Sequence, residues 1–71
     1  MAVIETPTGT LILRVWLEPG QTPPLRARLL VVDSVQQAPV AYAAAAGVDE
    51  ICAQVRRWME KWSENTERPD G

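Results

Sequence analysis

The sequence contains no histidine and a single cysteine, Cys52. Zinc and iron sites are built from several Cys or His ligands, so we expect no metal site and no bound cofactor. One cysteine also cannot form a disulfide within the chain. The absence of histidine removes the commonest general base and the usual activator of a Ser or Cys nucleophile. We therefore expect that the protein is not an enzyme, and we assign no catalytic residue.

The sequence also lacks an excess of positive charge and any long apolar segment. Seven Lys and Arg stand against nine Asp and Glu, so the net charge of −2 gives no global attraction to nucleic acid or anionic membranes. The apolar runs are much shorter than the ~20 residues that cross a bilayer. The opening MAVIETPTG has no basic stretch before an apolar one, which predicts no secretion signal. Together with the free thiol, this favours the cytoplasm.

A chain of 71 residues is close to the smallest size at which one hydrophobic core is stable without disulfides or metal. We expect association with another chain to supply further burial. Residues 1–9 are predicted to be a lead or a short edge strand, because Val3 and Ile4 precede a Thr-Pro-Thr-Gly stretch. The domain itself is predicted to span residues 10–63, and the polar residues 64–71 are predicted to be a disordered tail.

Two segments alternate between core-facing and outward residues and are predicted to be strands, from Thr10 to Glu18 and from Leu25 to Asp33. The prolines and glycine of PGQTPP separate them, because proline cannot donate to a strand ladder. An antiparallel register that keeps one face apolar pairs Val15 with Leu29. The same register predicts three further cross-strand pairs, Ile12 with Val32, Trp16 with Arg28 and Glu18 with Arg26.

The segment APVAYAAAAG admits two interpretations. Four consecutive alanines are typical of a helix, whereas Val40 and Tyr42 alternate with alanines and Gly47 ends the run. We favour a third strand here. From Val48 the apolar period changes to that of a helix, with one stripe of seven residues. The stripe consists of Val48, Ile51, Cys52, Val55, Trp58, Met59 and Trp62.

These elements predict an α+β fold, a three-stranded antiparallel β-meander followed by one C-terminal amphipathic helix on one sheet face. The apolar face that this helix is expected to cover comprises Leu11, Leu13, Val15, Leu17, Ala27, Leu29 and Val31. Within the stripe, Cys52 is predicted to be a buried thiol. Trp58 and Trp62 lie one turn apart. They either close the core at the open end of the sheet or form an anchor for a partner helix.

The opposite sheet face has nothing in the chain to cover it, unless Val3 and Ile4 fold back. Its aromatic, apolar and arginine side chains are typical of an interface centre, which predicts protein binding by homodimerisation or by docking to a larger partner. Alternatively, its arginines could bind phosphates while Trp16 stacks on a base, although Glu18 and the net negative charge make nucleic acid a weaker expectation. The candidate partner-binding residues are Ile12, Arg14, Trp16, Arg26, Arg28, Leu30 and Val32.

The stretches RVWLEPG and GVDEICAQVRRWMEKW carry a resemblance that covers roughly residues 10 to 62. The chain resembles small uncharacterised bacterial proteins with an R-[VI]-W-x-E-P strand and a D-E helix start, for which no activity is implied. More distantly, a sheet leading into an acidic helix start is similar to the partner-binding half of HicB-type antitoxins. The alternative function that we expect is thus a nucleic-acid-associated or antitoxin-like regulator that uses Arg14, Arg26 and Arg28 of the open sheet face, although this chain departs from the HicB-type family in having no evident DNA-binding tail.

Overall fold

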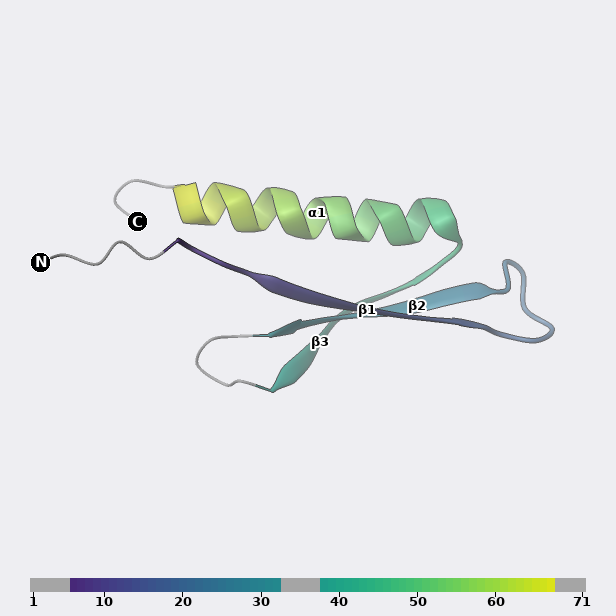
Figure 1. The fold of residues 1–71 in the computed structure, drawn as a ribbon. Coiled ribbons are helices and arrows are strands. Elements are labelled where there is room, and N and C mark those ends of the chain that lie inside the picture. The colour runs from purple at the N-terminus through teal and green to yellow at the C-terminus, as the bar shows by residue number, and fades with distance from the viewer. Residues whose placement is uncertain (1–5, 33–37, 68–71) are drawn as a thin grey trace, which may run out of the picture.

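The computed structural model of the chain describes residues 6–32 and 38–67. Three strands precede one helix: β1 (Thr10–Leu17), β2 (Leu25–Val32), β3 (Pro39–Ala46) and α1 (Val48–Glu67). The strands form one antiparallel sheet in the order β1-β2-β3, and α1 lies on one face of it (Figure 1). The predicted meander followed by a helix is therefore confirmed, and residues 39–46 form a strand. Val3 and Ile4 lie outside the described residues.

The connections explain why the elements are close-packed. The backbone N–H of Glu18 donates to the carbonyl of Pro24 at 2.8 Å, which closes the loop between β1 and β2. Gly47 alone separates β3 from α1, and its φ of 86° is a left-handed conformation that favours glycine. Its N–H donates to the carbonyl of Leu25 at 2.8 Å, and its own carbonyl accepts from Ile51 at 3.0 Å. The helix is thereby fixed directly beside the end of β3.

The predicted register between the first two strands is wrong by two residues. Val15 lies opposite Ala27 instead of Leu29. Because side chains alternate with a period of two, this shift leaves every residue on its predicted face. The predicted register would place Leu25 opposite Pro19, which has no N–H to donate. The observed register pairs Leu25 with Leu17 instead and adds one apolar pair to the ladder.

The helix covers only part of the predicted apolar face. It contacts β3 and β2, and the buried residues beneath or within it are Ala27, Leu29, Ala45 and Ile51. The prediction that the helix also covers Leu13, Val15 and Leu17 of β1 is wrong, because these side chains are exposed. The small alanines of β3 let the helix settle over that side of the sheet, as the one-residue connection at Gly47 requires.

The apolar row of β1, which we define as Leu11, Leu13, Val15 and Leu17, is left increasingly exposed along the strand. Leu11 is half-buried, whereas Leu13, Val15 and Leu17 are 46%, 53% and 71% exposed. In Figure 1, β1 begins close to the C-terminal end of α1 and diverges from the helix toward its own end. The exposed fractions follow this divergence.

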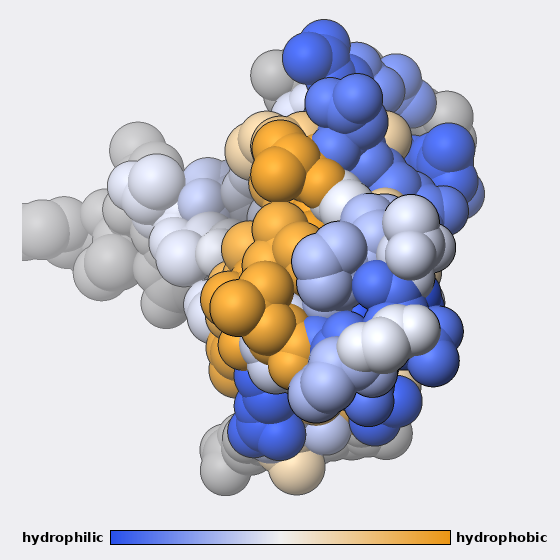
Figure 2. Space-filling view, turned by 90° about the vertical axis from the view of Figure 1, so that its right-hand side faces the viewer, coloured by the Kyte–Doolittle hydropathy of each residue, from blue (hydrophilic) through white to orange (hydrophobic). Residues whose placement is uncertain are grey.

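The apolar stripe of α1 is divided in the same way. Ile51 is buried against the sheet, but Val48 and Met59 are exposed, and Met59 lines a groove with Leu13 of β1. Cys52 is also exposed, so its predicted burial is wrong. Figure 2 views the end where β1 finishes and α1 begins, and it shows hydrophobic side chains in one band from helix to sheet. An apolar groove lies on this side, lined by Leu13, Ile51, Cys52, Val55, Arg56 and Met59.

The C-terminal end of α1 also differs from the sequence prediction. Residues 64–67 are helical, so the predicted disordered tail begins too early, and residues 68–71 lie outside the described part of the chain. Extending an existing helix by polar residues costs far less than starting one, which explains the extra turn. Within residues 6–32 and 38–67, no helix is both long and apolar enough to span a membrane.

Because one side of the apolar stripe of α1 is buried and the other is exposed, two substitutions on this helix should lower the free energy of unfolding by unequal amounts. Ile51→Ala removes a buried side chain packed near Ala27 and Ala45, so we expect a loss of about 2–4 kcal/mol in the free energy of unfolding. Met59→Ala truncates a side chain that is 52% exposed, and we expect a loss below about 1 kcal/mol. Urea unfolding at low protein concentration measures both. Equal losses would mean that the exposed side of the stripe is packed within the chain.

Candidate functional site on the open sheet face

All seven candidate residues lie on the sheet face opposite α1. Ala27 and Leu29 are buried beneath the helix, so the residues that alternate with them along β2 point to the other face. The register places the β1 candidates beside those of β2, with Ile12 opposite Leu30 and Arg14 opposite Arg28. Trp16 lies opposite Arg26, and Thr10 lies opposite Val32. The structure therefore brings the predicted site together, and we call this surface the open face.

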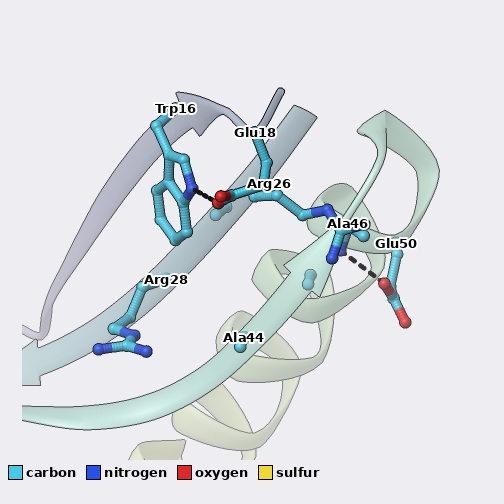
Figure 3. A pocket seen from close by; sticks show the side chains of 9 residues that line it. Trp16, Glu18, Arg26, Arg28, Ala44, Ala46 and Glu50 are labelled. Atoms are coloured by element: carbon cyan, nitrogen blue, oxygen red, sulfur yellow. Dashed lines mark hydrogen bonds between the residues drawn. The ribbon is translucent and has the colours of Figure 1, made fainter. Parts of the chain in front are cut away.

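The side chain of Trp16 is held in place by Glu18, the residue that follows the end of β1. Its indole Nε1 donates a hydrogen bond of 2.7 Å to the Glu18 carboxylate, and the side chain remains 38% exposed (Figure 3). The predicted pairs of Trp16 with Arg28 and of Glu18 with Arg26 do not form, because the register differs by two residues. The exposed part of the ring lies on the open face, with Arg26 opposite it on β2.

Arg26 has a structural role that the sequence did not indicate. Its Nε donates to the carbonyl of Pro23 at 3.0 Å, and its Nη2 donates to the side-chain carbonyl of Gln21 at 3.4 Å. These bonds tie the half-buried guanidinium to the loop between β1 and β2. Arg26 thus fixes this loop beside Trp16, and its side chain is less available to a ligand than the other two arginines.

Arg14 and Arg28 form an unfavourable pair of like charges on the open face. They lie directly opposite each other on neighbouring strands, and both are exposed. Like charges in this arrangement destabilise a sheet. Among the hydrogen bonds of the described residues, none joins either guanidinium to a carboxylate. A negatively charged group from outside the described chain would relieve this repulsion.

A shallow hollow of about 310 Å³ lies between these side chains and β3. Trp16 and Arg28 border one side of it, whereas the small Ala44 and Ala46 lie on β3 (Figure 3). Glu50 of α1 stands at the far rim and accepts a hydrogen bond of 2.6 Å from the N–H of Ala46. The volume is at the lower limit of small-molecule pockets, and the alanines of β3 have short side chains. Such a surface fits a partner backbone better than an enclosed ligand.

The two tryptophans of α1, which the sequence also marks as candidates, do not line this hollow. The rings of Trp58 and Trp62 stack with a centroid distance of 6.3 Å and an interplanar angle of 27°. Trp62 packs against Gly9 so closely that a Cβ built there would lie 2.5 Å from its Nε1. Both rings are half-buried at the end of the sheet, which supports the interpretation that they close the core. In the described part of the chain, no three Cys, Asp or Glu residues gather as metal ligands.

Comparison of the chain with protein-family models, curated proteins and solved structures finds no match. The resemblance to R-[VI]-W-x-E-P proteins and to HicB-type antitoxins therefore stays a prediction.

The repulsion between Arg14 and Arg28 predicts that a charge reversal stabilises the fold. Arg14→Glu places opposite charges across the strands, so we expect a gain of about 0.5–1 kcal/mol over Arg14→Gln in the free energy of unfolding. Arg14→Gln is the matched control, because it removes the charge while keeping a long polar side chain. Urea unfolding at low and high salt measures the difference, which should shrink as salt screens the pair. If Arg14→Gln were at least as stable as Arg14→Glu, charges at positions 14 and 28 would not interact across the strands.

Proposed function

We propose that the protein is a small, non-enzymatic interaction module that uses its open face around Trp16 to bind another protein. The partner is a second copy or a larger protein. The pair of Arg14 and Arg28, exposed and directly opposite each other, is the observation that carries this proposal. A face that keeps a destabilising pair beside an exposed tryptophan is better explained by binding than by stability.

The chemistry of the face favours a partner with acidic side chains. Arginine binds carboxylates through two parallel hydrogen bonds, and tryptophan and arginine are enriched among residues that dominate interface energies. Ala44 and Ala46 leave space for a partner segment to lie beside Trp16. The exposed thiol of Cys52 suits a reducing compartment, so we propose that the protein acts in the cytoplasm.

Single-stranded nucleic acid is the second candidate, since the same arginine pair could contact two phosphates while Trp16 stacks on a base. This would suit an antitoxin-like regulator. Two carboxylates, Glu18 and Glu50, border the hollow, and the chain carries a net charge of −2. Both features oppose a polyanion more than they oppose a protein with a few acidic side chains.

A photo-crosslinking amino acid at Ala44 tests the proposal in the native cell. Ala44 is exposed on the open face, so its replacement leaves Trp16 and the arginines in place. We expect crosslinks to one predominant protein, identified by mass spectrometry, and their loss when Arg14 and Arg28 are both changed to Glu. The same crosslinker at the exposed Arg57 of α1 is the matched control.

Three outcomes would contradict the proposal. Crosslinks that nuclease removes would assign the open face to nucleic acid. Equal crosslinking at Ala44 and Arg57, or none that depends on the two arginines, would show that the open face does not select a protein partner.

A further inference from the structure

The free edge of β1 offers a second binding surface, separate from the open face. Glu18 and Pro24 share a hydrogen bond and continue the β1-β2 register by one pair. In an antiparallel ladder, hydrogen-bonded pairs alternate with non-bonded pairs. The even-numbered residues of β1 therefore direct their N–H and C=O groups toward β2. Leu11, Leu13, Val15 and Leu17 direct theirs outward, away from the sheet.

The two edges of the sheet are protected to different degrees. β3 begins with Pro39, and its pairing with β2 is interrupted by a register shift opposite Leu29 and Leu30. Prolines and bulges are devices that prevent edge strands from pairing with other chains. β1 contains neither, and its eight residues pair with β2 without interruption. The regular edge is also the one whose outward backbone groups belong to the exposed apolar row.

We propose that a second copy of this chain pairs antiparallel with β1, with Val15 on the two-fold axis, to form a six-stranded sheet. The helix does not obstruct this pairing, because α1 lies over β2 and β3. Val15 then forms a hydrogen-bonded pair with Val15 of the second copy, and Leu13 pairs with Leu17 of the second copy. The two apolar rows become neighbours on the helix face, where cross-strand apolar pairs stabilise a sheet.

The positions of Arg14, Trp16 and Pro19 favour this register among those that keep the apolar rows together. With Val15 on the axis, Arg14 lies directly opposite Trp16 of the second copy, where a cation–π contact stabilises the pair, while Glu18 and Arg14 of the second copy both lie diagonal to it. A shift that puts Arg14 on the axis would align four arginines across the sheet, because each Arg14 already faces Arg28. A shift that puts Trp16 on the axis would place Leu13 opposite Pro19 and shorten the ladder.

Single-cysteine variants of the full chain, in a Cys52→Ser background, test the register under a mild oxidant. Hydrogen-bonded partners have Cα atoms about 5.5 Å apart, which a disulfide can span, whereas residues two positions out of register are too distant. We expect Val15→Cys to form a disulfide-linked dimer at least about tenfold faster than Leu17→Cys, which faces Leu13 instead of itself. Leu17 is the more exposed residue, so it is a stringent control for random collisions.

A proline substitution tests the same pairing without a cysteine. Because the N–H of Val15 points outward, Val15→Pro leaves the ladder with β2 intact and removes a bond to the second copy. We expect wild-type protein to dimerise in sedimentation equilibrium at high micromolar concentration, and Val15→Pro to remain monomeric with an unchanged circular dichroism spectrum. If Val15→Pro unfolds, the cysteine series still decides the question.

Three results would overturn the proposal: a monomeric wild type at high micromolar concentration, preferential linkage through Arg14→Cys or Trp16→Cys, or a folded Val15→Pro dimer. A monomeric wild type would also exclude a second copy as the partner of the open face, but crosslinking at Ala44 to a larger protein does not depend on the pairing of β1. Loss of the edge pairing with crosslinks at Ala44 retained is therefore distinguishable from failure of the proposed function.

Discussion

An α-helix is about 10 Å wide, whereas three strands at a spacing of about 4.8 Å form a sheet about 14 Å wide. One helix cannot cover such a sheet, and the single residue between β3 and α1 decides which side it covers. Gly47 starts the helix beside the end of β3, so α1 packs over β3 and β2. The exposed apolar row of β1, the exposed side of the helix stripe and the accessible strand edge are consequences of this placement.

β1 is consequently accessible from three directions. Its apolar row borders the groove beside α1, its other side carries Arg14 and Trp16, and its outward backbone groups lack a partner strand within the described chain. The buried core of the described residues is small and consists of four apolar side chains, those of Ala27, Leu29, Ala45 and Ile51. A chain of this size gains from burial against another molecule. Edge pairing would also join the open faces of two copies into one surface, so the two proposals are compatible.

The sequence determines the faces of the strands more firmly than their partners. Alternation placed Arg14, Trp16 and Arg28 on one face, and the structure agrees, since a two-residue register error does not change the face. The error itself arose because the apolar pairs of two registers are almost equivalent, and the choice depends on Pro19. The burial of Cys52 was predicted wrongly because a helical stripe shows which residues share a side, not how much sheet lies beneath them.

Amide hydrogen exchange of β1 as a function of protein concentration tests the central claim, that this strand is uncovered in one chain and covered by another. At low concentration, the amides of Ile12, Arg14 and Trp16 should be protected by β2, while those of Leu13, Val15 and Leu17 exchange rapidly. At high concentration, the second set should become protected as well. Protection of that set at the lowest concentration would show that the chain covers its own edge. Rapid exchange at every concentration would show that no second copy pairs with it.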